Sequence, residues 1–136
     1  MPAFVHRLRV RYSECDPQNH VFNANYLNFF DIALTELWRK AIGSYGAMTT
    51  AGVDMVVAEA IVRYRAPARF DDELDVALVV RRLGRTSMAS AIEITRGDEQ
   101  IVDGDMRHVF IDLGSGRPVP IPDRVREGLA AFATTK

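Results

Sequence analysis

Hydrophobic and polar residues alternate at every second position in five stretches of the chain. The stretches are residues 4–12, 53–64, 74–83, 87–95 and 101–113. A period of two is typical of strands that bury one face. Two of the expected inward faces are Phe4, Leu8, Val10 and Tyr12, and Val56, Ala58, Ala60, Val62 and Tyr64. The later stretches follow one another through turns rich in glycine, proline and aspartate, so the pattern predicts an antiparallel sheet with tight connections.

The apolar spacing becomes helical between the first and second strands. We expect a helix from Asn23, a favourable N-cap residue, to about Ile42, with Gly43 ending it. Its apolar positions are Tyr26, Leu27, Phe29, Phe30, Ala33, Leu34, Leu37, Trp38 and Ala41. They lie on nearly every side, as in a helix that other elements surround. About 18 helical residues span about 27 Å, enough to cross a whole sheet.

The remaining segments complete an α+β architecture. Residues 44–52 are expected to form a loop, and residues 123–132 a short helix. Gly104 interrupts the last strand, which indicates a bulge or a close approach by another group. A sheet curled around one long central helix leaves its edge strands uncovered, and a second copy of the chain would cover them. We therefore expect a homodimer or a homotetramer.

Composition narrows the range of functions. The chain has 136 residues, 48% of them hydrophobic and 26% charged, which suits one domain. A formal net charge of −1 argues against a nucleic-acid partner. No apolar run is long enough to cross a membrane, and the single cysteine, Cys15, excludes an internal disulfide. We expect a cytoplasmic protein without a membrane partner, metal or cofactor.

The candidate chemistry lies in the stretch from Tyr12 to Asp31, where a polar loop leads into the long helix. Asp16 precedes a proline in a turn and could be structural, or it could act as nucleophile or general base. Asn19 suits a left-handed backbone. His20 could carry a proton or simply lie on the surface. Asn23 could cap the helix, and its backbone N–H could also polarise a carbonyl oxygen.

Other polar residues have weaker claims to a site. His6 and His108 lie in strands, and we expect them to be structural, with His108 a hydrogen-bonded core residue. Arg82 and Arg85 flank a short turn, where they could hold an anion or be ordinary surface charge. No pair of histidines has metal-ligand spacing, and no serine lies in a nucleophile-elbow context.

The segment Tyr12–Asp31, which contains Asp16-Pro17, His20-Val21 and Asn25-Tyr26-Leu27, resembles the hydroxybenzoyl-coenzyme A thioesterase branch of the hotdog-fold acyl-CoA thioesterases. The segments 64–67 and 83–87 and the acidic turn at 71–72 are also similar to this family. The resemblance implies a hotdog fold, in which a five-stranded antiparallel sheet wraps one helix and active sites lie at a dimer interface.

The same resemblance implies roles for individual residues. Asp16 matches the catalytic aspartate, and Asn23 matches the position whose N–H polarises the thioester carbonyl. The family commonly has glycine where Asn19 stands, some members have histidine where Asn23 stands, and others have a histidine that matches His20. The substrate would be an acyl-CoA. Its acyl group would contact Phe22, Tyr26 and Phe30, and its phosphates would contact Arg82 and Arg85.

Two other functions remain open at this stage. One is a non-catalytic hotdog module that binds an acyl-thioester or a related ligand. The other is a hydratase or dehydratase of the same fold, for which Asp16 and His20 make a poor acid–base pair.

Overall fold

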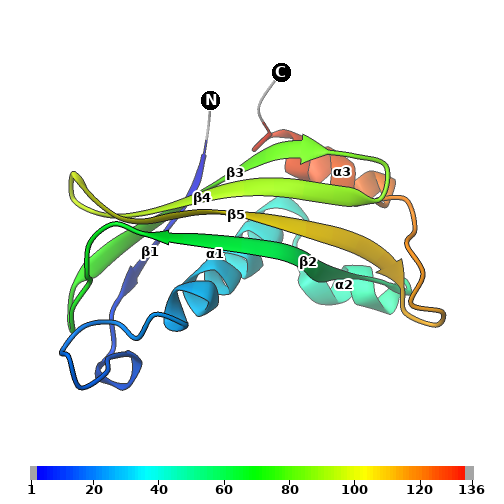
Figure 1. Ribbon diagram of the computed structural model, residues 1–136. Helices are drawn as coiled ribbons and strands as arrows, with labels where there is room; N and C mark the ends of the chain where they lie inside the picture. Colours follow the sequence, from blue (N-terminus) through cyan, green and yellow to red (C-terminus); the bar gives the residue numbers. More distant parts are fainter. Residues whose placement is uncertain (1–2, 134–136) are drawn as a thin grey trace.

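The computed structural model describes residues 3–133 and shows five antiparallel strands curved around one long helix (Figure 1). The strands are β1 (Phe4–Arg9), β2 (Val53–Tyr64), β3 (Glu73–Leu83), β4 (Ser87–Arg96) and β5 (Glu99–Asp112). Their order across the sheet is β1-β3-β4-β5-β2. The helix α1 (Asn25–Ala41) lies along the concave face of the sheet. The predicted α+β hotdog architecture is confirmed.

Strand β2 lies at an edge of the sheet and not beside β3, the next strand along the chain. The expectation of tight turns throughout is wrong for the connection from β2 to β3, because these strands are not neighbours. Strand β2 instead pairs with β5, so β1 and β2 form the two edges. The alternation in the sequence cannot reveal this order, because it reports which face of a strand is buried and not which strand lies beside it.

A bulge in β2 also changes the face that the first half of the strand buries. The register shifts between Val57 and Glu59, so that Val57 lies opposite His108 while Ala60 lies opposite Met106. The expected inward positions Val56 and Ala58 are therefore wrong. The extra residue of a bulge reverses the alternation beyond it.

Helix α1 starts two residues later than the sequence indicated. Its N-cap is Ala24, and no side chain caps it. The expected cap at Asn23 is therefore wrong, and the side chain of Asn25 holds the preceding loop instead. The helix ends as expected: Ile42 is the C-cap, and Gly43 has a φ of +103° and donates its N–H to Trp38. Seven residues of α1 are buried against the sheet: Tyr26, Phe29, Phe30, Ala33, Leu34, Leu37 and Trp38.

Gly104 lets α1 approach the sheet closely. A Cβ atom added there would lie 3.0 Å from the Phe30 ring and would overlap the carbonyl oxygen of Ile61. The expected close approach is confirmed, and β5 pairs regularly with both neighbours at this residue. The sequence showed the need for glycine but not that Phe30 causes it.

The remaining elements lie at the ends of the sheet. Strand β1 stops at Arg9, and a 3-10 turn, η1 (Tyr12–Glu14), follows, so Tyr12 is 80% exposed and not inward as expected. The segment predicted as a loop contains a short helix, α2 (Tyr45–Thr50), capped by Ser44. The last helix is α3 (Asp123–Ala130). Within residues 3–133 no helix is long and apolar enough to cross a membrane.

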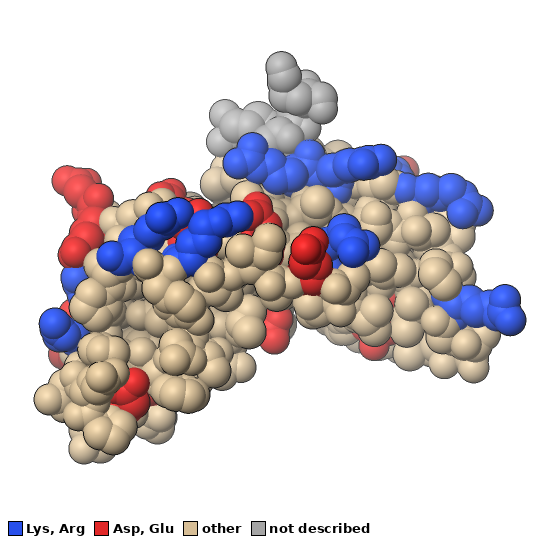
Figure 2. Space-filling view, in the orientation of Figure 1, with Lys and Arg blue, Asp and Glu red and all other residues tan. Residues whose placement is uncertain are grey.

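Charged side chains are unevenly spread over the surface. Figure 2 shows Lys and Arg side chains along the upper rim of this view, and acidic side chains among them on the sheet. Arg63, for example, contacts Asp103 and Asp105 at 3.0 and 2.7 Å. The end of the molecule that carries the polar loop, at the lower left, is mostly uncharged on the face seen in this view.

Candidate active site

The polar loop before α1 is a closed turn that its own backbone holds together. Cys15 and Val21 form an antiparallel bridge, and the N–H of Asp16 donates to the carbonyl of His20 at 3.0 Å. Asn19 has a φ of +67°, the left-handed conformation that the sequence indicated, and its N–H donates to the Asp16 carbonyl at 2.9 Å. Asp16 therefore sits on a rigid turn, which is favourable for a group that must be positioned accurately.

Glu14 and Asn25 fix this turn against the start of α1. The carbonyl oxygen of Glu14 accepts hydrogen bonds from the Asn25 side-chain amide at 2.9 Å and from the Phe22 N–H at 3.0 Å. The buried Glu14 carboxylate accepts from the backbone N–H of Arg11 at 2.7 Å and from its guanidinium at 2.8 Å. Val21 donates to the Ala68 carbonyl at 2.8 Å, which joins the turn to the chain beyond β2.

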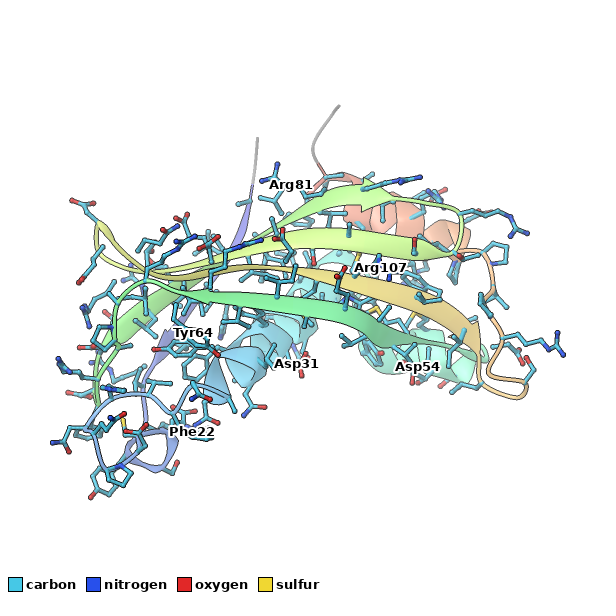
Figure 3. All side chains as sticks on the ribbon, in the orientation of Figure 1. Phe22, Asp31, Asp54, Tyr64, Arg81 and Arg107 are labelled. Atoms are coloured by element: carbon cyan, nitrogen blue, oxygen red, sulfur yellow. The ribbon has the colours of Figure 1, made fainter. Side chains whose placement is uncertain are left out.

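A cavity of about 440 Å³ lies beside the turn. It is lined by Asp16, Gln18, His20, Val21, Asn23, Tyr26, Tyr64, Arg65, Ala66 and Pro67. The Tyr64 hydroxyl donates to the Asn23 carbonyl at 3.1 Å, and its ring packs edge-on against Tyr26. Burial raises the pKa of Tyr26, so this phenol stays protonated. Figure 3 shows Tyr64 at the end of the molecule where α1 begins.

The Asp16 carboxylate has one oxygen occupied and one available. Oδ1 accepts the Gln18 N–H at 2.9 Å, and no hydrogen bond within residues 3–133 uses Oδ2. The side chain is 18% exposed, and it reaches the cavity. The Nδ1 atom of His20 lies 4.0 Å from Oδ1 and 3.4 Å from the Val21 carbonyl. Asp16 and His20 are therefore neighbours, separated by slightly more than a direct hydrogen bond.

The backbone just before α1 presents unpaired donors. Asn23 is exposed, and in the described part of the chain neither its N–H nor that of Ala24 donates a hydrogen bond to another protein atom. Both precede a 17-residue helix, whose N-terminal end carries a partial positive charge. Such a group can stabilise a negative oxygen.

The structure brings Asp16, His20, Asn23 and Tyr26 together at one cavity. The other predicted site residues of the same protomer do not line this cavity; they are Phe22, Phe30, Arg82 and Arg85. Phe22 is 47% exposed and does not line the cavity, and Phe30 is fully buried against Gly104. Arg82 lies near the end of β3 and Arg85 lies in the turn between β3 and β4, at the opposite end of the sheet (Figure 1). There the Arg85 carbonyl accepts the Ile121 N–H at 2.9 Å.

Sequence reasoning missed one side of the cavity. Gln18 supplies the N–H that holds Asp16, and Tyr64, Arg65, Ala66 and Pro67 form the opposite wall. The alternation in the sequence placed Tyr64 on the inward face of its strand, and only the family resemblance of residues 64–67 pointed to this segment. The long-range pairing of Val21 with Ala68, which brings this wall to the loop, leaves no periodic mark in the sequence.

The neighbouring charges and thiol have ordinary structural roles. Arg65 donates to Asp103 at 2.8 Å, and its hydrogen bond is the main cause that lowers the pKa of that carboxyl. Burial, with the nearby Asp16 and Glu14 charges, raises the pKa of the Cys15 thiol, which makes it a poor nucleophile. Across residues 3–133, no group of three or more His, Cys, Asp or Glu side chains could hold a metal ion.

Comparison with known proteins identifies relatives of this chain in sequence and in structure. Residues 10–129 match the model of the thioesterase-like superfamily. The chain is 29% identical over 126 residues to a putative esterase of Aquifex aeolicus, covering 93% of this chain and 97% of the relative. It is 28% identical to the acyl-CoA thioester hydrolase YbgC of Escherichia coli O6:H1, covering 87% of this chain and 89% of the relative. A crystal structure of a hypothetical protein from Aquifex aeolicus superimposes with a TM-score of 0.88 at 28% identity, covering 93% of this chain and 98% of that chain.

Proposed function

Because the chain belongs to the thioesterase-like superfamily, we propose that it hydrolyses acyl-CoA thioesters to a free acid and coenzyme A. Asp16 is the reacting carboxylate in this proposal. One observation carries this proposal. Asp16, whose Oδ2 atom accepts no hydrogen bond from the described residues, and Asn23, whose N–H is unpaired among them, line the same cavity ahead of the helix start. A carboxylate opposite an oxyanion site is the combination that thioester hydrolysis needs.

The proposed reaction begins with the thioester carbonyl beside Asn23. Its oxygen gains negative charge as the carbonyl carbon is attacked, and the Asn23 N–H and the dipole of α1 stabilise that charge. Asp16 either attacks the carbon itself or removes a proton from an attacking water. The carbon–sulfur bond then breaks, and coenzyme A leaves as a thiolate. If Asp16 attacked the carbon, the acyl group remains on Asp16 as an anhydride, and a water hydrolyses it to the free acid and restores the carboxylate; if a water attacked, the free acid forms directly.

His20 is proposed to serve proton transfer. Its ring lies 4.0 Å from Asp16 and lines the same cavity, so a single water could connect the two groups. A histidine can pass a proton to the departing thiolate near neutral pH. Tyr26 forms the apolar wall behind the carbonyl, because its ring is buried and its hydroxyl accepts the Ala68 N–H.

We further propose that two copies pair through strand β2. This edge strand is 12 residues long, and six consecutive residues, 56–61, are exposed. Val57 is 51% exposed and Val56 is 44% exposed, an unusual length of open apolar edge for an isolated chain. Arg82 and Arg85 lie far from the Asp16 cavity of their own chain. In such a pair they could contact the coenzyme phosphates only at the Asp16 cavity of the other copy.

The test is thiol release from a panel of acyl-CoAs of short, medium, long and aromatic acyl groups, followed with a thiol-reactive dye. The proposal expects release from at least one class, with the rate rising hyperbolically with substrate concentration. A folded protein that binds acyl-CoA and releases no thiol from any of them would contradict hydrolysis and favour a binding module.

A further inference from the structure

Tyr64 joins the sheet to the start of α1 through its hydroxyl group. It is the last residue of β2 and is 55% exposed. The hydroxyl donates to the Asn23 carbonyl oxygen at 3.1 Å, across 41 residues of sequence. Water can satisfy both groups of an exposed hydrogen bond, so this contact adds little to the stability of the fold. Its interest lies in its place, because Tyr64 and Asn23 both line the Asp16 cavity.

The surrounding structure holds the Tyr64 side chain beside the helix start (Figure 3). Tyr64 ends the ladder between β2 and β5. Directly after it, the N–H groups of Arg65 and Ala66 both donate to the Ile101 carbonyl, at 2.9 and 3.1 Å. The Tyr64 ring also packs edge-on against the buried ring of Tyr26, with the ring centroids 5.7 Å apart. The hydroxyl is therefore presented to α1 from a fixed place on the sheet, as a positioning group requires.

The hydrogen bond holds the peptide group that joins Asn23 to Ala24. Within residues 3–133, the only other donor to this carbonyl oxygen is the Tyr26 N–H, at the long distance of 3.4 Å. The N–H of the same peptide group belongs to Ala24, which has helical angles of φ −69° and ψ −21°. The N–H and C=O of a trans peptide point in opposite directions. With its oxygen bound to Tyr64, the peptide therefore directs the Ala24 N–H out of the helix start, as free N–H groups of a helix do.

Asn23 and Ala24 thus present two successive free N–H groups. The peptide group before Asn23 is held in a similar way, because the Phe22 carbonyl accepts the Asn25 N–H at 2.8 Å. Each of the two free donors therefore belongs to a peptide group whose oxygen is already hydrogen-bonded. A hydrogen bond to the oxygen of an amide polarises its N–H and strengthens it as a donor. Two such donors stabilise a developing negative oxygen better than one.

We propose that Tyr64 is a positioning residue for the oxyanion site: its hydroxyl holds the Asn23–Ala24 peptide group so that the Ala24 N–H acts beside that of Asn23. This role rests on the proposed thioester hydrolysis, whereas the hydrogen bond and the free N–H groups do not depend on it.

Two other roles for a tyrosine at a cavity make different predictions. A proton donor needs a free hydroxyl proton, but the Asn23 carbonyl already accepts the proton of Tyr64. An apolar wall needs only the ring. Tyr64→Phe keeps the ring and its contact with Tyr26 and removes only the hydroxyl, so this one variant separates all three roles.

The first test measures kcat, KM and the pH dependence of kcat for Tyr64→Phe on the best acyl-CoA of the panel. We expect kcat to fall about tenfold, the size of one well-placed hydrogen bond. We expect KM to change little, because the lost contact serves the charged transition state more than the bound substrate. The inflections of the pH profile are expected to stay where they are in the wild type, and so is the urea midpoint.

Tyr45→Phe is the matched control. The Tyr45 hydroxyl donates to Asp54 towards the other end of β2 (Figure 3), and neither residue lines the Asp16 cavity. This variant is expected to keep the wild-type kcat. A wild-type kcat in Tyr64→Phe would overturn the proposal, whether or not KM rises. The loss of an inflection from the pH profile of Tyr64→Phe would also overturn it, in favour of proton transfer.

A second measurement needs no substrate. The backbone amide signals of Ala24 are compared by NMR in the wild type, Tyr64→Phe and Tyr45→Phe. A shift of the Ala24 nitrogen in Tyr64→Phe alone is expected, because the peptide loses the bond to its oxygen while the neighbouring ring stays. An unchanged Ala24 signal would overturn the proposal. The shift without thiol release by the wild type would retain the hold of Tyr64 on the helix start and contradict hydrolysis itself.

Discussion

At the scale of single residues, the Asp16 carboxylate is held in place through one oxygen while its other oxygen accepts no hydrogen bond from the described residues. Its backbone and Oδ1 atom are held by Asn19, His20 and Gln18. This arrangement fixes the direction of attack without using the reacting oxygen. The proximity of a positioned group can account for a large part of a catalysed rate, and small displacements remove much of it.

Asn25 is expected to position the catalytic turn. Its side chain donates to the Glu14 carbonyl at 2.9 Å and so ties the turn to α1. Asn25→Ala is expected to lower kcat at least tenfold through misplacement of Asp16, while the free energy of unfolding falls by only about 1 kcal/mol. Steady-state kinetics and urea unfolding measure the two effects. The control is Thr49→Ala, which removes a hydrogen bond to the Gly46 carbonyl far from the cavity. Unchanged kcat in Asn25→Ala would contradict a positioning role.

The burial of His108 predicts that the free energy of unfolding depends on pH in a specific way. The residue is 2% exposed, and its Nδ1 atom has no hydrogen-bond partner within residues 3–133, so the expectation of a hydrogen-bonded core histidine is wrong. Its folded pKa of about 4 lies below the ordinary value of 6.5, so the unfolded chain takes up a proton first as the pH falls. Stability is therefore complete above pH 6.5 and is lost towards pH 4. The loss amounts to about 3 kcal/mol. The difference in unfolding free energy between wild type and His108→Leu, measured across this range, is expected to shift by that amount in favour of the variant. A difference that stays constant with pH would contradict a buried neutral ring.

At the scale of secondary-structure elements, the packing of α1 on the sheet decides what the loop can do. In the second turn of the helix, the Phe30 ring packs against Gly104 on β5. That contact fixes the height of the helix above the sheet, and with it the place of the Asn23 N–H.

Gly104→Ala is expected to disturb this contact. The new methyl group would overlap the Ile61 carbonyl and press on Phe30. Neither backbone nor a buried ring can move freely, so the free energy of unfolding is expected to fall by about 2 kcal/mol or more. The control is Gly46→Ala in α2, where the nearest atom lies 3.8 Å away and no positive φ is required; it is expected to be neutral or mildly stabilising. Thermal or urea unfolding of both variants checks the difference, and equal stabilities would show that the core absorbs the methyl group.

The elements themselves could be predicted from the sequence because each rests on a local rule. Alternation marked all five strands, and helical spacing with Gly43 marked the end of α1. The turn at Asn19 followed from the left-handed tolerance of asparagine. What could not be predicted depends on distant pairing: the place of β2 at the edge, its bulge after Val57, and the second wall of the cavity at Tyr64. The family resemblance added the role of Asp16, which no local rule could supply.

At the scale of the whole molecule, the two edges of the sheet are unequal. Strand β1 has six residues and alternates between exposed and covered positions, whereas β2 has 12 and exposes six in a row. An open edge of that length is a template for another strand.

Ala58→Asp is expected to separate the proposed dimer. Residue 58 lies near the middle of β2, so a two-fold axis through the strand would set the two new charges against each other. Size-exclusion chromatography with light scattering is expected to give a dimer for the wild type and a monomer for the variant. Val5→Asp on the opposite edge, at a residue that is 53% exposed, is the control and is expected to remain a dimer. A wild-type monomer at micromolar concentration would contradict the pairing.

The measurement that tests the central claim most directly compares thiol release by wild type and Asp16→Asn on the best acyl-CoA of the panel. The amide keeps the size of the side chain and its contact with Gln18 but cannot attack or accept a proton. We predict a fall in kcat of at least a hundredfold, with KM changed little, while Asp98→Asn in the β4–β5 turn keeps the wild-type rate. An Asp16→Asn variant that releases thiol as fast as the wild type would contradict the account.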